Sequence, residues 1–382
     1  MTHSATLDTQ FTCTKGTYRL HRLPERHHPS LRAWDAADEY LLQRLNEERP
    51  QTPLLLINDA FGALGVALHE HNPTLWYDNV VEADALELNL ARNHLASLEQ
   101  RPQSALPPTD ARQVVVKLLR SSALLDWQLA MLNTYLPTGT PVLLGGMLKH
   151  VTPADIAVLE ARLDGINTSR IVKKARVWHA VTSSRGQLPG IQQIPLLQPN
   201  VVLHNRQGVF SPKRLDPGAE CLLRHLADFD RAAVPDDAHI VDLCCGSGVL
   251  GLAWLLHHPT HHLLATDASV AAVTSAELTL KANLPAAAHW AVTLADGLKN
   301  HTMRSADVIL CNPPFHQADT VTTDVARQLF AQASSAIKQD GQFVVVGNRH
   351  LGYHQLLKNH FKQVSTISQD KRFVVLVATQ PK

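Results

Sequence analysis

The chain has 382 residues, 45% of them hydrophobic and 18% charged, and its formal net charge is +1. This composition excludes an intrinsically disordered chain, and no uninterrupted apolar run is long enough for a membrane span, so we expect a cytoplasmic globular protein with no membrane partner. The length allows two domains, and the near-neutral net charge confines any nucleic-acid binding to local basic patches.

The first half of the chain predicts an α/β unit. Its apolar strands alternate with segments of helical character: LLLI (54–57), NDAFGALGVAL (58–68), TLWYDN (74–79), VVEADALELNLARNHL (80–95), QVVVK (113–117) and PVLLGG (141–146). Strand–helix alternation of this kind predicts a doubly wound, mainly parallel sheet with helices on both faces.

The second half repeats this alternation more clearly. A helical segment, GVLGLAWLLHH (248–258), follows its first strand; a second helix is opened by the cap residue Ser269, and a third is closed by Gly341. QVSTISQD (363–370) and RFVVLVAT (372–379) predict a terminal antiparallel pair. The remaining predicted strands are HIVDLC (239–244), HLLATD (262–267), HWAVTLAD (289–296), ADVILCN (306–312) and QFVVVGN (342–348).

The two halves align as copies of one unit. LLLINDAFGALGVAL (54–68) aligns with HIVDLCCGSGVLGLAW (239–254), so that Gly62 and Gly65 match Gly248 and Gly251. The same order of elements at a nearly constant offset favours duplication over convergence. The alignment sets Asp78 opposite Asp267, and it replaces the polar residues of the second copy as follows: Leu56 for Asp242, Ala60 for Gly246 and Lys117 for Asn312.

The first copy therefore keeps the scaffold and loses the polar groups. We predict a degenerate domain over residues 1–188 and a functional domain over residues 200–382. The boundary falls in SSRGQLPGIQQIPLLQPN (183–200), which is rich in Gln, Pro and Gly and has no helical periodicity.

Cysteine and histidine usage indicates neither disulfides nor metals. The five cysteines form no CxxC pair and no secreted disulfide framework, so we expect reduced thiols. His257, His258, His261 and His262 cluster without a cysteine or carboxylate ligand at fixed spacing. We interpret them as the exposed end of a helix and the loop that follows, and we expect no metal.

The second copy carries a glycine loop of the nucleotide-binding type. Gly246, Gly248 and Gly251 spell G-x-G-x-x-G between a strand and a helix, where the backbone can approach a bound nucleoside. Asp267 ends the next strand, where an acid binds ribose hydroxyls. A nicotinamide cofactor and S-adenosylmethionine (SAM) both fit these residues. Asp242 favours SAM, because a carboxylate there would repel a pyrophosphate.

The fourth strand ends in an unusual loop, NPPF, made of Asn312, Pro313, Pro314 and Phe315. Proline has no N–H to donate and cannot continue a sheet, so this loop is stiff. Asp296, which ends the preceding strand, either meets the adenine of a cofactor or is a turn residue. All these strand ends lie at the carboxyl edge, where doubly wound folds bind their ligands.

Together, D-x-x-x-G-x-G, the acid at the next strand end and N-P-P-F resemble the SAM-dependent amino-methyltransferases. The resemblance is closest to the ribosomal RNA guanine-N2 methyltransferases of the RlmG and RsmC type, and it covers nearly the whole chain. GVFSPKRLDPGAECLL (208–223) resembles the segment that leads into their catalytic domain. Four further segments resemble the RlmG branch: CNPPFHQ (311–317), NRHLGY (348–353), AWDAADEYLL (33–42) and LINDAFGALG (56–65).

The resemblance implies two tandem Rossmann-like methyltransferase domains, the first degenerate and used for RNA recognition. It implies SAM-dependent methylation of the exocyclic N2 amine of a guanine in large-subunit 23S rRNA, protein-free or assembled, by a monomer without a metal. This family usually has glycine where Cys244 stands. The cofactor-binding positions carried over are Phe210, Asp242, Cys244, Gly246, Gly248, Asp267, Ala268, Asp296, Gly297 and Asn312.

We expect catalysis by alignment. The Asn312 side-chain oxygen and the Pro313 carbonyl would accept the two N–H groups of the guanine amine and aim its lone pair at the methyl group. Pro314 would stiffen the loop, and Phe315 would stack on a base flipped out of the RNA. Cys311 would face the other side of the strand, so we interpret it as a packing residue and not a nucleophile.

Two basic regions are candidate RNA-binding surfaces, although a solvated basic edge is the alternative interpretation. The first lies in the degenerate copy and the second near the active-site entrance: Arg170, Lys173, Lys174 and Arg176, then Arg206, Lys213, Arg214 and Arg349.

Other functions remain open at this point. A small-subunit 16S rRNA guanine-N2 methyltransferase would share the same motifs. A protein glutamine N-methyltransferase favours Tyr over Phe after N-P-P and has a smaller, helical N-terminal domain. A catalytically silent SAM- or RNA-binding module predicts erosion of residues such as Asp242 and Asn312, which are present. A nicotinamide dehydrogenase leaves the NPPF loop unexplained.

Overall fold

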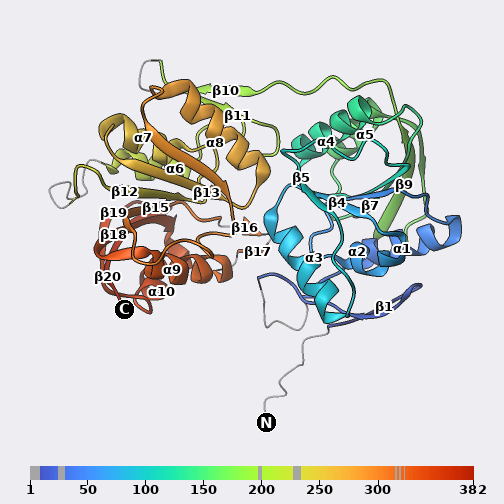
Figure 1. Cartoon of the computed structure of the whole chain (residues 1–382), viewed down its shortest axis with the longest axis horizontal. Helices are drawn as coiled ribbons and strands as arrows, with labels where there is room; N and C mark the ends of the chain where they lie inside the picture. The colour runs from blue at the N-terminus through green and yellow to red at the C-terminus, as the bar shows by residue number, and fades with distance from the viewer. Residues whose placement is uncertain are drawn as a thin grey trace, which may run out of the picture. The chain divides into compact units, whose positions relative to one another are not determined.

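The computed structural model describes residues 9–24, 31–196, 200–226, 234–314, 316–317, 320–321 and 323–382. The chain forms two compact units, Met1–Pro189 and Gly190–Lys382; the first runs from blue to green in Figure 1 and the second from yellow to red. Among the described residues, none of the helices combines the length and apolar character that a membrane crossing needs.

The first unit is built on a seven-stranded sheet of order β5-β4-β3-β6-β7-β9-β8. The first five strands in this order are parallel, and β9 runs antiparallel to both its neighbours. Its elements are β1 (Gln10–Cys13), β2 (Gly16–Arg19), α1 (Ala36–Glu48), β3 (Leu54–Ile57), α2 (Ala63–Ala67), β4 (Thr74–Tyr77), α3 (Val80–Arg92), β5 (Gln100–Pro102), β6 (Gln113–Lys117), α4 (Ser122–Tyr135), β7 (Pro141–Met147), α5 (Pro153–Arg162), β8 (Leu163–Thr168) and β9 (Ala175–Thr182).

The second unit has a seven-stranded sheet of order β14-β13-β12-β15-β18-β20-β19, in which β20 is antiparallel to both neighbours. This order matches that of the first unit strand for strand, which confirms the predicted pair of Rossmann-like domains. Its elements are β10 (Gln192–Pro195), β11 (Val202–Asn205), α6 (Pro217–Arg224), β12 (His239–Leu243), α7 (Val249–His257), β13 (His262–Asp267), α8 (Val270–Asn283), β14 (His289–Leu294), β15 (Ala306–Cys311), β16 (His316–Gln317), β17 (Thr320–Val321), α9 (Asp324–Ala336), β18 (Ile337–Asn348), the 3₁₀ turn η4 (Arg349–Leu351), α10 (Tyr353–Leu357), β19 (Phe361–Gln369) and β20 (Phe373–Pro381).

The two faces of the second sheet pack against different helices. Leu310 of β15 belongs to a core with α6, α7 and α8, and Cys311 belongs to a core with α9 and α10, so these helix groups lie on opposite sides of the sheet (Figure 1). Side chains alternate along a strand, so the residue after Cys311 is directed to the α6 side. Cys311 is fully buried, which confirms its interpretation as a packing residue.

Strand register tests the alignment of the two copies. Leu56 pairs with Val115 of β6, and Asp242 pairs with Leu310 of β15, so Leu56 and Asp242 are equivalent. Gly62 and Gly248 also correspond, because each precedes a helix in the left-handed conformation, with φ of 74° and 77°. Only glycine adopts this conformation at little cost, so the turn explains both residues.

The predicted match of Asp78 with Asp267 is wrong by one residue. Leu56 pairs with Leu75, and Asp242 pairs with Ala265. Counting two residues further along each strand sets Tyr77 opposite Asp267 and Asp78 opposite Ala268. The helix caps that follow, Asn79 and Ser269, agree with this register. The sequences alone tolerate a shift of one residue here, which sets the single acid Asp78 opposite Asp267, and only pairing across the sheet fixes the register.

The predicted end of the third helix at Gly341 is also wrong. The helix α9 ends at Ala336, and Gly341 lies inside β18, which begins at Ile337. Ile337 is fully buried and pairs with Ala306 of β15, so an extended backbone here extends the sheet and buries an apolar side chain. The Ser269 cap is confirmed: its side chain accepts a hydrogen bond from the Ala272 N–H.

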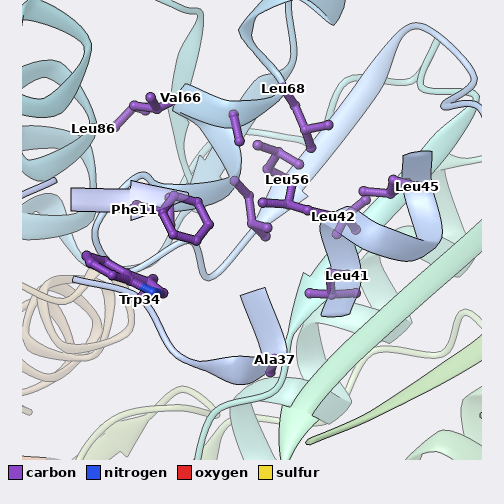
Figure 2. Close-up of a cluster of buried hydrophobic side chains, with 14 of the residues drawn as sticks. Phe11, Trp34, Ala37, Leu41, Leu42, Leu45, Leu56, Val66, Leu68 and Leu86 are labelled. Atoms are coloured by element: carbon purple, nitrogen blue, oxygen red, sulfur yellow. The ribbon is translucent and has the colours of Figure 1, made fainter. Parts of the chain in front are cut away.

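The first unit has a core residue, Leu56, at the position equivalent to Asp242. Figure 2 shows Leu56 among apolar side chains that include Leu42 and Leu45 of α1 and Leu68 after α2. These side chains are fully buried. A carboxylate here would be buried against hydrocarbon, so the first unit uses as core the position that the second unit gives to an acid.

Candidate functional site

The candidate site lies at the carboxyl edge of the second sheet. The strands β12, β13, β14 and β15 run parallel, so their last residues meet at one edge. This edge carries Asp242, Asp267, Asp296 and Asn312 in the order of their strands along the chain. The side chains predicted from four separate segments therefore come from neighbouring strands of one sheet.

Asp242 is a buried acid with one unused oxygen. Its side chain has no solvent exposure, and its Oδ2 accepts a hydrogen bond of 2.8 Å from the Gly251 N–H of α7. Its Oδ1 has no hydrogen-bond partner in the described part of the chain. Burial raises the pKa of Asp242 from 3.8 to about 7, against the lowering effect of the Gly251 N–H. A buried acceptor without a donor costs about 1–3 kcal/mol, so this oxygen is suited to a ligand that brings one.

The glycine loop leaves open space at Gly246. Gly246 has φ of 54°, and a Cβ added there would meet no atom within 4 Å. Its N–H donates to Asp267 Oδ2 over 3.0 Å, and Asp267 Oδ1 accepts from the Ser269 N–H over 3.0 Å. The Asp267 carboxylate thereby links the glycine loop to the start of α8 and is held at the edge of the open space.

Cys244 adopts the conformation that favours glycine. Its φ is 62°, in the left-handed region that costs a side-chain residue energy. Its thiol hydrogen-bonds with that of Cys311, which together with burial raises the pKa of Cys244 well above 9. The equivalent residue of the first unit, Asn58, has φ of 63°, so the turn is the same in both copies.

Asn312 is fixed by a residue that the sequence did not single out. Its Nδ2 donates a hydrogen bond of 2.8 Å to Asp216 Oδ2, and its Oδ1 is buried without a partner among the described residues. Gly218 leaves room for this oxygen, since a Cβ there would lie 2.8 Å from it. Asp216 also caps α6 by accepting from the Ala219 N–H over 3.0 Å. The side-chain amide is thus held so that its oxygen remains a buried acceptor without a donor among the described residues.

Sequence reasoning could have found Asp216 only as a helix cap. Asp before Pro217 is typical of a helix start, because aspartate caps well and proline fits the first turn. The contact with Asn312 spans 96 positions of the chain, and no local pattern predicts it. Pro313 is buried and Pro314 is exposed; Phe315 lies outside the described residues.

The remaining predicted cofactor positions lie around the same edge. Asp296 Oδ2 accepts from Gln328 Nε2 of α9 over 2.9 Å, and Gly297 has φ of 63° in the turn that follows. Ala268 lies half-buried directly before the Ser269 cap. Phe210 is 72% exposed, an unusual exposure for a large apolar ring. A ring so exposed gains most by packing on a ligand or a partner.

The predicted basic residues have different environments. Lys213, Arg214 and Arg349 are exposed, as are Arg170, Lys173 and Lys174 in the connection between β8 and β9; Arg176 is half-buried. Arg206 was expected on an RNA-binding surface, but it is only 4% exposed, and its backbone N–H donates to Ser275 Oγ over 2.9 Å. That expectation is corrected: the strand β11 packs on α8 and buries Arg206 at its end.

Lys117 occupies the Asn312 position of the first unit. It forms ion pairs of 2.6 Å with Asp38 and 3.1 Å with Asp35. Asp35 caps α1 just as Asp216 caps α6, so both copies tie the end of the fourth strand to the cap of the same helix. Both units keep this contact. In the first unit it is an ion pair, and the Lys117 ammonium has no acceptor atom equivalent to Asn312 Oδ1.

The histidines and other potential metal ligands do not form a metal site in the described part of the chain. No three His, Cys, Asp or Glu side chains there gather in a way that could hold a metal ion. His261 was expected to be exposed, but it is buried, and its Nδ1 accepts from Trp254 Nε1 over 3.0 Å. A tryptophan N–H needs an acceptor when buried, and this histidine supplies it.

Two different sequence families match the two halves of the chain. Residues 8–184 match the family described as RLMG N-terminal domain, and residues 200–377 match the family described as Methyltransferase small domain. A protein of Aeromonas salmonicida named Ribosomal RNA large subunit methyltransferase G is 37% identical over 367 residues, covering 94% of this chain and 96% of the relative. A protein of the same name from Pseudomonas aeruginosa is 39% identical over 371 residues, with the same coverage.

A solved structure supports the fold. The 16S rRNA N2 methyltransferase RsmC of T. thermophilus, determined in complex with AdoMet and guanosine, matches with a TM-score of 0.76. The match covers 97% of each chain at 21% sequence identity. Both units of the present chain therefore share the fold of that protein.

Proposed function

Because the chain belongs to the ribosomal RNA large subunit methyltransferase G family, we propose that it transfers a methyl group from SAM to the exocyclic N2 amine of a guanine in large-subunit rRNA. Family membership supports the cofactor and the substrate class. The observation that carries the chemistry is the buried Asn312 Oδ1, an acceptor without a donor that Asp216 holds in place.

The residues of the second unit fit SAM. The unpaired Oδ1 of Asp242 would accept from the ammonium of the methionine part, and the open space at Gly246 would take the cofactor against the backbone. Asp267 would bind ribose hydroxyls, and Asp296 with Gly297 would lie at the adenine; Phe210, Cys244, Gly248 and Ala268 complete the proposed set. When bound, SAM supplies an electrophilic methyl group on a sulfonium centre.

The protein's contribution to the reaction is alignment. The lone pair of the guanine amine is delocalised into the ring, so this nitrogen is a poor nucleophile. Asn312 Oδ1 would accept one N–H of the amine, and the Pro313 carbonyl would accept the other, which favours a tetrahedral nitrogen with its lone pair directed at the methyl group. Asp216 prevents the Asn312 amide from turning its N–H₂ toward the amine, where two donors would repel. Positioning of this kind supplies much of a barrier reduction without a strong base.

The Asp216 contact gives a first prediction. We expect Asp216→Ala to lower kcat roughly 10- to 100-fold, because the Asn312 amide is then free to rotate, while the dissociation constant for SAM stays unchanged. Asp216→Asn keeps an oxygen that can accept from both Asn312 and the Ala219 N–H, so we expect it to recover most of the loss. Steady-state kinetics with rRNA and calorimetric SAM binding measure the two effects.

A purely structural role for Asp216 predicts something else. Loss of the α6 cap alone costs about 1 kcal/mol of stability and would lower the amount of folded enzyme without changing kcat per active site. Active-site titration with SAM separates the two cases. Equal kcat per site in wild type and Asp216→Ala would contradict a positioning role.

Asp242 predicts how SAM binding depends on pH. Its pKa is raised to about 7, so the carboxyl group is neutral below this pH and ionised above it. Only the ionised form attracts the ammonium of SAM, so we expect the dissociation constant to fall about tenfold between pH 6 and pH 8. Isothermal titration across this range with the cofactor alone measures it. We expect Asp242→Asn to bind SAM more weakly and without this dependence.

A stability measurement on the cofactor-free protein is the control. Because the folded-state pKa lies above the ordinary 3.8, folding takes up a proton between these values, and stability falls as pH rises toward about 7. Asp242→Asn should lack this fall. A wild-type dissociation constant for SAM that does not change with pH would show that Asp242 does not bind the ammonium. The same change of stability with pH in wild type and Asp242→Asn would also contradict this role.

Methyl transfer from labelled SAM tests the proposed substrate. We expect label in 23S rRNA and none in ribosomal protein, with the wild-type enzyme sedimenting as a monomer. Separate reactions with protein-free rRNA and with assembled subunits identify the stage of the substrate. Label in 16S rRNA alone would favour the small-subunit alternative, and label in protein would favour a glutamine methyltransferase.

A further inference from the structure

A cationic cleft lies at the carboxyl edge of the second sheet. It has a volume of about 670 Å³. Two segments line it: Asn348, Arg349 and His350 at the end of β18, and Lys371, Arg372 and Phe373 in the turn before β20. We call it the Arg349–Arg372 cleft. Its basic side chains are exposed, whereas Asn348 and Phe373 are half-buried.

The two segments are joined by hydrogen bonds. The Arg349 N–H donates to the Arg372 carbonyl over 3.0 Å, and Arg349 Nη1 donates to the Asp370 carbonyl over 3.2 Å. Asp370 Oδ1 accepts from the N–H groups of Arg372 and Phe373, each over 2.6 Å. The one acid of the turn is therefore used to hold the turn, and the cations are presented from a defined backbone.

These cations are not paired with carboxylates. In the part of the chain that the structure describes, no Asp or Glu oxygen lies within 4.0 Å of a charged nitrogen of Arg349, Lys371 or Arg372. Glu220 of α6 pairs with Arg224 of its own helix. A hollow with several unpaired cations is an electrostatic site for a polyanion.

The first unit has an equivalent turn before β9, but one of its cations has a carboxylate partner. Met147 pairs with Ala175 as Asn348 pairs with Phe373, so Lys173 and Lys174 correspond to Lys371 and Arg372. The backbone bond is also shared, since Leu148 N–H donates to the Lys174 carbonyl over 2.9 Å. In the first unit, however, Lys173 is paired with Glu39 over 2.7 Å. The duplicated turn has kept its two cations in both copies, and only the second copy leaves both without a carboxylate.

The cleft lies beside the proposed catalytic loop. Cys311, directly before Asn312, pairs with Val345 of β18, and β18 continues three residues further to Asn348. At a rise of about 3.3 Å per residue, the cleft begins about 10 Å beyond the level of Cys311 on the neighbouring strand. An RNA strand whose base is held at Asn312 would therefore pass its backbone along this edge.

We propose that the Arg349–Arg372 cleft binds the phosphodiester backbone of rRNA next to the nucleotide held at Asn312. The inference rests on the proposed function for its ligand, and it assigns Lys371, Arg372 and His350 a role alongside Arg349. Arginine and lysine at a groove position strands through phosphate contacts that carry no sequence information. The cleft therefore contributes affinity and register, while the NPPF loop selects the base.

The salt dependence of RNA binding tests this inference. Binding of protein-free 23S rRNA is measured by filter retention without SAM, for wild type and for the Lys371→Ala/Arg372→Ala double variant, at several salt concentrations. Each lost phosphate contact on a single strand lowers the slope of log affinity against log salt by about 0.7, so we expect a slope smaller by about 1.4. Extrapolated from 1 M to 0.1 M salt, that change weakens binding roughly 25-fold. The dissociation constant for SAM should not change.

A matched control removes two charges elsewhere in the same unit. Lys358 and Lys362 are exposed. Lys358 follows α10 and Lys362 is the second residue of β19, so both lie at the opposite edge of the sheet. We expect Lys358→Ala/Lys362→Ala to keep the wild-type slope within about 0.3. A wild-type slope in Lys371→Ala/Arg372→Ala, an equal loss in both double variants, or no salt-dependent binding by the wild type would each overturn the proposal.

Turnover separates this inference from the proposed function. If the cleft binds RNA backbone, the double variant raises KM for rRNA and leaves kcat at saturating RNA within about twofold. If the double variant shows the expected loss of slope but the wild type transfers no methyl group to rRNA, the proposed function alone is refuted. A wild type that transfers methyl to rRNA, with a double variant of unchanged slope, would refute the cleft alone.

Discussion

Replacement of Asn312 by alanine is expected to lower kcat for methyl transfer to rRNA by about 10²–10³-fold. The variant removes the buried Oδ1 that we propose accepts from the amine, and it leaves Asp216 without its partner. The loss of one preorganised hydrogen-bonding group in a site of this kind has an effect of this size. SAM affinity should change far less, because Asp242 and the glycine loop remain. Single-turnover reactions with labelled SAM and calorimetry of SAM binding separate the two quantities.

Two variants sharpen this experiment. Asn312→Asp retains the acceptor oxygens but sets a second carboxylate against Asp216, so we expect activity to stay low at neutral pH and to recover partly as pH falls. Cys311→Ala changes the neighbouring buried residue, which faces the other core, so we expect kcat within about threefold of wild type. Near-normal transfer by Asn312→Ala would refute the assigned mechanism.

Replacement of Lys117 by methionine is expected to destabilise the first unit by about 3–5 kcal/mol. Burial alone would lower the pKa of Lys117, but the Asp38 and Asp35 carboxylates outweigh burial and raise it, so the ion pair is well formed in the folded protein. Asp38 is only 4% exposed. Without the ammonium, a buried carboxylate lacks its counter-charge. Urea unfolding followed by tryptophan fluorescence measures the loss.

The pH dependence of that loss identifies its cause. In Lys117→Met the Asp38 carboxyl should take up a proton on folding, so the deficit is largest at high pH and shrinks as pH falls toward about 4. Lys149→Met removes an exposed lysine of the same unit and should alter stability by less than about 0.5 kcal/mol. A Lys117→Met deficit below about 1 kcal/mol, or one independent of pH, would contradict a buried ion pair.

Sequence patterns were sufficient for the parts of the fold that local periodicity determines. The buried strand before Gly246, the cap at Ser269 and the equivalence of Gly62 with Gly248 all follow from short-range rules. Patterns failed where tertiary contacts decide. Ile337 extends a strand because Ala306 is there to pair with it, and Tyr77 rather than Asp78 stands opposite Asp267 because of strand register.

In the candidate site, too, local patterns predict some residues and tertiary contacts decide others. Residues at strand ends, such as Asp242 and Asn312, were predictable because parallel strands must end at one edge. Asp216 was not, because its contact with Asn312 joins distant segments. Arg206 was misjudged, since a basic residue in a loop-like sequence gives no sign that α8 will bury it. Lys371 and Arg372 were not predicted, because the cleft that they line with Arg349 is formed by two segments that are distant in sequence and joined only by strand pairing.

Nucleoside analysis of 23S rRNA after incubation with SAM and the enzyme shows directly whether the protein methylates the N2 amine of guanine. We expect N2-methylguanosine as the new methylated nucleoside with wild type, and little or none with Asn312→Ala at equal SAM occupancy. Methylation of another atom or base would contradict the proposed function, and undiminished N2-methylguanosine from Asn312→Ala would contradict the role of Asn312.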